Sequence, residues 1–204
     1  MMQAASKPYW DFEWDYTMGK LEEQPGWSSS VSGTASSTMT STGEKFVSNN
    51  SSYYNVWMTS AGVQGANRFF TSGYGTLEVV FSGKYNMPTN GANNFRITAA
   101  INSSTKRVTL IQAGPSNNFK WRVLDNNTPA NCTAIASCSN NTKYKVKIVM
   151  KDTVADIYIN DVLVKADQST ADSLYGTSNN VMHQNGGGST NYAILESLKI
   201  HQGQ

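Results

Sequence analysis

Long hydrophobic runs are absent from this chain of 204 residues. A helix that crosses a bilayer needs about 18 or more consecutive apolar residues, and no such stretch occurs, so we expect no membrane partner. The opening segment, MMQAASKPYW, also lacks the apolar stretch of a secretion signal. If the protein leaves a cell, we expect lysis, transport inside a particle, or processing that the sequence does not show.

Charge is also scarce, because Asp, Glu, Lys and Arg make up only 15% of the residues and the formal net charge is +2. So small an excess is not the basic footprint of a nucleic-acid-binding protein, and we expect no nucleic-acid partner. The one local run of positive charge, Lys143, Lys145, Lys147 and Lys151, alternates with apolar residues. Such alternation indicates the solvated face of a strand, and a stripe that binds polyanions is the alternative.

Cysteine and histidine are represented by two residues each, which limits metal and nucleophile chemistry. Cys132 and Cys138 are close enough in sequence for a local disulfide if a turn brings them together; two free thiols are the alternative. No further Cys or His lies near them at metal-site spacing. His183 and His201 are far apart, and neither has the neighbours of a catalytic triad.

The chain is rich in Ser, Thr, Asn and Gly, with Val and Tyr, a composition that favours short strands joined by turns over a helical bundle. The clearest pattern is YKVKIVM, where apolar residues alternate with lysines as in a strand that buries one face. The segment DIYINDVLV follows, and its Asn160-Asp161 pair tolerates the positive φ angles of a two-residue hairpin turn. We expect an antiparallel meander over residues 144–164.

Other strands are expected from the same alternation, beginning with WDFEWDY, which has one aromatic and one acidic face. They lie near residues 53–57, 73–85, 95–102, 107–112, 119–124 and 192–201, with a weakly hydrophobic strand pair in 31–47. Residues 125–141 and 165–189 are expected to be long connections. The pattern predicts an all-β fold, a two-sheet antiparallel jelly-roll sandwich of about eleven strands with the first and last side by side. Residues 1–8 are expected to be a short N-terminal arm, and residues 9–204 a single domain.

The segments WDFEWDY, GYGTLEVVF, YKVKIVM, DIYINDVLV and YAILESLKI occur in an order that resembles the concanavalin A-like lectin/glucanase superfamily. The stretch WDFEWDYTMG, followed by a Trp and a Ser/Thr/Gly-rich strand pair, is similar to lectin-like modules in structural proteins of bacteriophages and prophages. The resemblance implies two curved sheets whose ligands lie on the concave face or on loops at its rim. It also implies a virion or extracellular location.

Candidate catalytic residues are Glu13 and Asp15, because residues two apart on a strand point the same way and glycoside hydrolysis needs two nearby carboxylates. Glucanases of the superfamily carry Glu-x-Asp-x-Glu on a central strand, but here the third position is Thr17 and no nearby acid replaces it by spacing. We therefore expect no enzyme, with a glycoside hydrolase or polysaccharide lyase as an alternative. No cofactor is expected. Asp152 and Asp156 could bind calcium together with backbone carbonyls; the alternative is that they belong to a turn that merely prefers Asp.

Carbohydrate binding is the expectation that remains, since sugar rings offer apolar C–H faces to aromatic side chains and hydroxyls to polar ones. One candidate surface is the aromatic cluster of residues 53–57, and another joins Trp121 to two arginines. The candidate carbohydrate-binding residues are Tyr53, Tyr54, Trp57, Asn93, Asn94, Arg96, Trp121, Arg122, His183 and Asn185. Core packing is the alternative for the aromatic residues, and turn formation is the alternative for the polar ones.

The function expected from these features is that of a non-enzymatic lectin-like module, displayed on a phage particle and binding bacterial surface glycans. The alternative is a decoration or fibre-head domain that contacts other virion proteins or copies of itself and binds no sugar.

Overall fold

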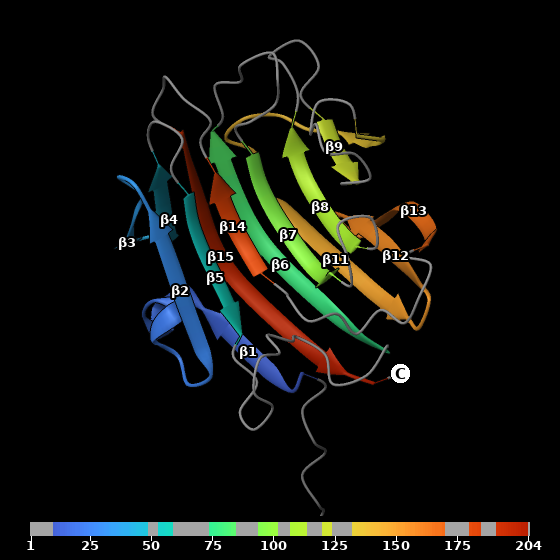
Figure 1. The fold of residues 1–204 in the computed structure, drawn as a ribbon, viewed down its shortest axis with the longest axis horizontal. Coiled ribbons are helices and arrows are strands. Elements are labelled where there is room, and N and C mark those ends of the chain that lie inside the picture. Colours follow the sequence, from blue (N-terminus) through green and yellow to red (C-terminus); the bar gives the residue numbers. More distant parts are fainter. Residues whose placement is uncertain are drawn as a thin grey trace, which may run out of the picture.

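The fold is given by a computed structural model, which describes residues 10–48, 53–58, 74–84, 94–101, 107–113, 120–123, 132–169, 180–184 and 191–203. Within these ranges the chain forms fifteen strands and two short 3-10 helices, η1 (Tyr16–Met18) and η2 (Leu21–Glu23), and no α-helix. Every strand pair is antiparallel. The expected all-β sandwich is confirmed (Figure 1).

One layer is an eight-stranded sheet with the order β13-β12-β11-β6-β15-β4-β3, in which β1 also pairs with β15. Its strands are β1 (Phe12–Asp15), β3 (Ser36–Thr40), β4 (Gly43–Ser48), β6 (Tyr74–Lys84), β11 (Tyr144–Lys151), β12 (Val154–Ile159), β13 (Val162–Ser169) and β15 (Asn191–Gln202). The expected meander is β11-β12-β13, and the weakly hydrophobic pair β3-β4 lies at the edge of this sheet.

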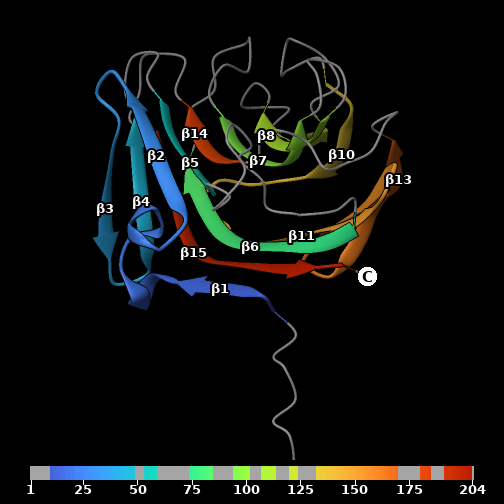
Figure 2. The same ribbon diagram turned by 60° about the horizontal axis from the view of Figure 1, so that its bottom comes forward.

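The other layer is a seven-stranded sheet with the order β10-β9-β8-β7-β14-β5-β2. Its strands are β2 (Trp27–Ser32), β5 (Tyr53–Met58), β7 (Asn94–Ile101), β8 (Arg107–Ala113), β9 (Lys120–Val123), β10 (Ala134–Ser137) and β14 (Asn180–Gln184). Figure 2 shows this sheet lying inside the curve of the eight-stranded sheet. Because the layers are stacked, the outward face of the seven-stranded sheet is the concave one.

The core lies between the two sheets, and strict alternation decides which residues enter it. In β11, Tyr144, Val146, Ile148 and Met150 are buried while the residues between them face solvent. Leu77, Val79 and Phe81 of β6 lie beside them on the same face. From the opposite layer, Trp121 packs edge-on against Phe81, with ring centroids 5.6 Å apart.

The two-residue turn between β12 and β13 has the backbone that the sequence predicts. Asn160 and Asp161 adopt φ angles of 51° and 64°. Asn160 also accepts a hydrogen bond from Lys145 N through its Oδ1 atom, at 2.9 Å. The turn is therefore held to the neighbouring strand β11 as well as closing the hairpin.

The first and last strands are neighbours, as expected, because Phe12 pairs with Ile200 and Asp15 with Ser197. β4 pairs with residues 191–195 of β15, so β1 and β4 occupy successive parts of one strand edge. The edge that β15 would otherwise expose is therefore covered along most of its length.

Two expected connections contain strands. β10 lies within residues 125–141, while β13 runs to Ser169 and β14 occupies Asn180–Gln184 inside the segment 165–189. The sequences of β10 and β14, AIAS and NVMHQ, show no apolar alternation. These strands form because neighbouring strands offer backbone hydrogen bonds, which a local pattern does not reveal.

The residues between β1 and β2 form the two 3-10 helices, which the alternation pattern does not predict. The expected N-terminal arm, residues 1–8, lies outside the described residues. In the described part of the chain, no helix has the length and apolar character needed to cross a bilayer.

Candidate functional site

The outward face of the seven-stranded sheet is the candidate site. Trp121 and Val123 of β9 are buried in the core, so Arg122 between them belongs to the outward face. Ile97 of β7 is likewise buried, which assigns Arg96 to the outward face. The strand register joins these positions into one row across the sheet, called here the central row: Ser30, Asn55, Met182, Arg96, Ile111, Arg122 and Ala134.

Three cations form a basic cluster on this face: Arg96, Lys120 and Arg122. Arg96 and Arg122 occupy the central row on either side of β8, so their backbones are about 10 Å apart, and Lys120 is about 7 Å along β9 from Arg122. Arg122 is buried, and its Nη1 donates to the carbonyl of Cys132 at 2.7 Å. Lys120 Nζ donates to Ser137 Oγ at 3.2 Å. Arg96 and Lys120 are half-buried and bring positive charge closer to solvent.

The thiol of Cys138 lies close to two cations of this cluster, Lys120 and Arg122. Burial raises the pKa of Cys138 to about 12, while Lys120 and Arg122 both act to lower it. Both cations are therefore close enough to the thiol to act on its ionisation. Cys138 and the buried Cys132 are free thiols.

Charge differs sharply between the two sheets. The seven strands of the candidate face contain no Asp or Glu, and their basic residues are Arg96, Arg107, Lys120 and Arg122. The strands of the eight-stranded sheet contain both signs: acids at Glu13, Asp15, Glu44, Glu78, Asp156, Asp167 and Glu196, and lysines at Lys45, Lys84, Lys145, Lys147, Lys151, Lys165 and Lys199. Positive charge without acidic neighbours in the strands is thus a property of one layer.

The lysines that alternate along β11 belong to the balanced sheet. Lys143, just before β11, pairs with Glu196 at 2.6 Å, and Lys145 pairs with Asp161 at 2.5 Å. Lys151 pairs with Asp156, also at 2.5 Å. These acidic partners favour the solvated strand face over a polyanion-binding stripe.

Two of the expected binding residues are core residues, which corrects the sequence interpretation. Trp121 has no exposed surface and packs edge-on against Phe81 and Tyr144. Tyr54 is buried and stacks on Phe46 at 5.1 Å between ring centroids. Because adjacent residues of a strand face opposite ways, Trp121 cannot share a surface with Arg122.

Tyr53 keeps its place in the candidate site. It is half-buried and lies two residues from Asn55 on β5, so the two share the outward face. Asn55 Oδ1 is buried and finds no hydrogen-bond donor in the described part of the chain. An aromatic ring beside an amide is the combination that a sugar ring and its hydroxyls require.

The remaining expected residues are placed by their backbone only or lie elsewhere. Trp57 is on β5, two residues beyond Asn55. Asn94 of β7 pairs in register with Gln184 of β14. His183 of β14 pairs with Tyr54 on one side and with Phe95 on the other. Asn93 and Asn185 lie outside the described residues.

The candidate catalytic carboxylates lie on the opposite layer and have structural partners. Glu13 is exposed and pairs with Lys199 at 3.2 Å. Asp15 caps η1 by accepting hydrogen bonds from Thr17 N at 2.8 Å and Thr17 Oγ1 at 2.5 Å. These bonds hold the pKa of Asp15 below its ordinary value. Thr17, which occupies the third position of the glucanase motif, is thus the residue that donates both hydrogen bonds to Asp15.

Asp152 and Asp156 also have local roles. Asp152 adopts a positive φ of 62° in the turn between β11 and β12. Asp156 accepts a hydrogen bond from Asp167 N at 3.1 Å and pairs with Lys151. Among the described residues, no group of three or more His, Cys, Asp or Glu is arranged to hold a metal ion.

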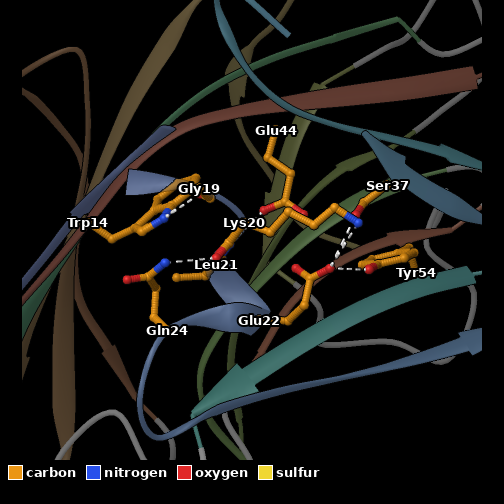
Figure 3. Close-up of polar contacts among 9 residues, drawn as sticks. All are labelled: Trp14, Gly19, Lys20, Leu21, Glu22, Gln24, Ser37, Glu44 and Tyr54. Atoms are coloured by element: carbon orange, nitrogen blue, oxygen red, sulfur yellow. Dashed lines mark hydrogen bonds and ion pairs between the residues drawn. The ribbon is translucent and has the colours of Figure 1, made fainter. Parts of the chain in front are cut away.

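A pair of acids, the half-buried Glu22 of η2 and the buried Glu44 of β4, is the most unusual chemical feature that the sequence did not indicate (Figure 3). Glu44 has no exposed surface and accepts a hydrogen bond from Leu21 N at 3.0 Å. Glu22 Oε1 accepts hydrogen bonds from Tyr54 Oη at 2.5 Å and from Ser37 Oγ at 3.2 Å.

The two carboxyl groups are close enough for each to shift the pKa of the other. Burial and the hydrogen bond to Glu22 raise the pKa of Glu44 to about 8. Burial alone would also raise the pKa of Glu22, but hydrogen bonds from protonated Glu44 and from Tyr54 lower it. The pair fastens η2 across the end of the sandwich where β4 and β5 face each other. Since Glu44 is shielded from solvent, its role is structural.

A cavity of about 410 Å³ lies at the end of the eight-stranded sheet. Its lining comes from the start of β6, the end of β11 and the end of β15, and includes Tyr74, Met150, Lys151 and His201. The lining is mostly apolar, and its one lysine is already paired with Asp156.

Lys120 and Asn55 are site residues that the sequence interpretation missed. The signal for Lys120 was present, because KWR puts two cations on the same face of one strand. The sequence alone does not show which face this is; the structure does, because Trp121 between the two cations is buried in the core.

Comparison with known proteins identifies the fold. No protein-family model matches the chain, and no curated protein matches it. Among solved structures, a Crh5 transglycosylase in its apo form superposes with a TM-score of 0.62 at 12% identity, over 95% of this chain and 84% of that one. The VIP36 exoplasmic/lumenal domain, bound to Ca2+ and Man2, gives a TM-score of 0.59 at 11% identity, over 93% and 86%.

Two further matches have carbohydrate-related names. Domain 4 of AbnA, an extracellular arabinanase from Geobacillus stearothermophilus, in complex with arabinotriose, gives a TM-score of 0.56 at 12% identity, over 94% and 91%. The chain also matches a sialidase but spans only 18% of its length. These likenesses show that the fold is the concanavalin A-like sandwich of lectins and glucanases, which confirms the predicted fold class.

Proposed function

We propose that this protein is a lectin-like carbohydrate-binding module that binds glycans on the outward face of the seven-stranded sheet. The observation that carries the proposal is the outward face of this sheet, where the half-buried side chains of Asn55 and Arg96 share one surface with the half-buried ring of Tyr53. Aromatic, amide and guanidinium groups together provide the stacking and hydrogen bonding that a sugar requires. The fold is shared with the VIP36 domain and the AbnA domain, whose structures contain bound sugars.

The module is proposed to have no enzymatic activity. Its candidate carboxylates, Glu13 and Asp15, lie on the other layer, and the strands of the proposed binding face contain no carboxylate. Glycoside hydrolysis of the usual kind needs two carboxyl groups on either side of the scissile bond. These strands supply neither of them.

The setting we propose is a phage particle or another extracellular surface, where the module contacts bacterial surface glycans. Support comes from the resemblance of WDFEWDYTMG to phage modules and from one structural match. A carbohydrate esterase of bacteriophage phi24B gives a TM-score of 0.54 at 11% identity, over 86% of this chain and 89% of that one.

The test is binding of the purified protein to an array of bacterial polysaccharides, followed by affinity measurements on two variants. Tyr53→Ala removes the ring on the proposed face and is expected to weaken binding at least about fivefold. Tyr158→Ala is the matched control, because Tyr158 is also half-buried in a strand but belongs to the eight-stranded sheet. It is expected to leave the affinity unchanged.

Three results would contradict the proposal. The first is an absence of binding to every polysaccharide with the protein at millimolar concentration. A stable oligomer on sizing chromatography without any sugar response would instead indicate a decoration or fibre-head domain. Release of reducing ends from a bound polysaccharide would show an enzyme.

A further inference from the structure

We propose that this protein associates with a second copy of itself through β3, an edge strand of the eight-stranded sheet. In the described part of the chain the two sheets end in four strands, β13 and β3 in one layer and β10 and β2 in the other. An edge strand leaves backbone N–H and C=O groups without a partner strand, and proteins usually protect such edges from pairing with another chain. The four edges differ in this protection.

Three of the edges are charged, distorted or flanked by another segment. β13 carries Lys165 and Asp167, and its register with β12 shifts at two points. β10 has only four residues and a register shift against β9. The 3-10 helix η2 packs against β2, and Trp27 N donates to the carbonyl of Gln24 at 3.1 Å. Charges, bulges, short strands and covering segments all hinder the pairing of an edge with another chain.

β3 has neither charges nor bulges. Its sequence, SSTMT, contains no charged residue and no proline, and its five residues pair with β4 in one unbroken register. Thr38 and Met39 are both exposed, although neighbouring residues of a strand face opposite ways, so both faces of β3 are open to solvent. Figure 2 shows β3 at the outer margin of the molecule. An added strand therefore has access to this edge.

The sandwich is also open on the side where β3 lies. Met39 is opposite the buried Glu44 of β4, and Val31 of β2 is opposite the buried Tyr54 of β5. Residues that pair across strands share a face, so Met39 and Val31 belong to the inner faces of their sheets. They are nevertheless 37% and 49% exposed, respectively. A partner beside β3 would therefore cover apolar side chains as well as backbone groups.

The composition of β3 fits a second copy of the same strand. A two-fold axis through Thr38 makes two copies of β3 antiparallel, so that every residue of the strand finds a partner. The axis places Ser36 of one protomer opposite Thr40 of its partner, Ser37 opposite Met39, and Thr38 opposite Thr38. No like charges meet, because β3 is uncharged, and hydroxyl side chains are favourable cross-strand neighbours.

This symmetry has a consequence for the proposed binding face. A two-fold axis that joins two antiparallel strands within one sheet runs perpendicular to that sheet, so both protomers turn the same face to the same side. The outward faces of the two seven-stranded sheets then point the same way, and both can engage one polysaccharide or one cell surface, which raises the apparent affinity. The bivalence rests on the proposed function, whereas the dimer itself does not.

Sedimentation velocity in the absence of sugar tests the dimer. Between about 1 μM and about 1 mM protein, we expect the mass to rise from 22.3 kDa toward twice that value. Thr38→Lys puts two like charges opposite each other and is expected to weaken dimerisation about tenfold or more. Thr38→Glu is expected to do the same. An equimolar mixture of the two variants should recover the dimer, because a lysine then faces a glutamate.

Leu163→Lys is the matched control, because Leu163 is an exposed residue of β13 at the opposite edge of the same sheet. It should leave the dissociation constant of the dimer unchanged. Circular dichroism checks that each variant is folded. Thr38 is exposed, and if one of its two variants does not fold, the other still tests the contact.

A monomer at every concentration would overturn the proposal. Equal losses in Leu163→Lys and Thr38→Lys, or a mixture that associates no better than either variant alone, would place the contact elsewhere and also overturn it. Association that continues past the dimer would contradict the two-fold symmetry. Because no sugar is present, the lectin function is tested separately: a monomer that binds glycans leaves that function standing, and a dimer that binds none leaves this inference standing.

Discussion

At the scale of single residues, the buried Glu44 and its partner Glu22 make stability depend on pH. Glu44 has a pKa of about 8 in the folded protein, against an ordinary value of 4.5. The folded state therefore holds a proton that the unfolded state releases between these values. The free energy of unfolding contributed by Glu44 is complete below pH 4.5 and declines until the pH passes about 8.

The first prediction is that Glu44→Gln removes this decline. The glutamine amide still donates a hydrogen bond to Glu22, and its carbonyl still accepts from Leu21 N, but it does not titrate. We expect urea unfolding of the natural protein to lose roughly a few kcal/mol between pH 5 and pH 9, while the variant loses much less. Glu13→Gln is the control, because Glu13 is exposed, and should follow the natural protein.

An identical pH profile in Glu44→Gln and the natural protein would mean that the pKa of Glu44 is not raised in the folded state. Glu22 acts in the opposite direction, because its pKa is lowered. Its contribution is present above its ordinary pKa and is lost as the pH falls through its folded value. The natural protein should therefore be most stable in mildly acidic solution.

Residue-level prediction from sequence succeeds where alternation has one clear phase. Ile148 and Ile157 are fully buried, as the meander pattern predicts. It fails at Tyr53-Tyr54, where two aromatic residues in a row leave the phase of the strand open. The structure shows that Tyr54 enters the core and donates to Glu22, a partner 32 residues away in sequence. No local pattern contains that information.

At the scale of elements, the hairpin between β12 and β13 depends on two residues with positive φ. Asp161 has a φ of 64°, a region that Gly and Asp tolerate and β-branched residues avoid. Asp161→Val should therefore destabilise the protein by about 1–2 kcal/mol. Asp161→Gly is the matched control, since it also removes the ion pair with Lys145 but permits the backbone.

Thermal or urea unfolding of the two variants separates the backbone from the ion pair. The glycine variant should remain within about 0.5 kcal/mol of the natural protein, because exposed ion pairs contribute little. Equal destabilisation in both variants would instead make the carboxylate of Asp161 the important group.

Elements with strong alternation were predictable, and elements without it were not. β6 and β11 have apolar residues at every second position and lie near their expected bounds. β10 and β14 are short and lack alternation; β10 lies at the edge of the seven-stranded sheet, and β14 lies inside it between β7 and β5. Their pairing energy comes from partners that are distant in sequence, so the segments that contain them resemble loops.

At the scale of the whole molecule, the strand order sorts charge into layers. In the sequence, Arg96 lies in the fragment FRI, and Lys120 and Arg122 lie in the fragment KWR. Arg96 and Lys120 are 24 residues apart, and no local pattern connects the two fragments. The register through β8 brings Arg96 and Arg122 into one row. The basic face is therefore a consequence of topology. Arg96 and Arg122 could therefore be proposed from the sequence as single residues, but their place in one row could not, because it depends on the strand register.

The most direct test of the central claim is an NMR titration of the labelled protein with an oligosaccharide of the tightest-binding polysaccharide. The account predicts that amide shifts change along β5, β7 and β9, including Asn55, Arg96 and Arg122. Amides of β11 and β12, such as those of Lys147 and Tyr158, should stay in place. Shift changes concentrated on the eight-stranded sheet would contradict the account.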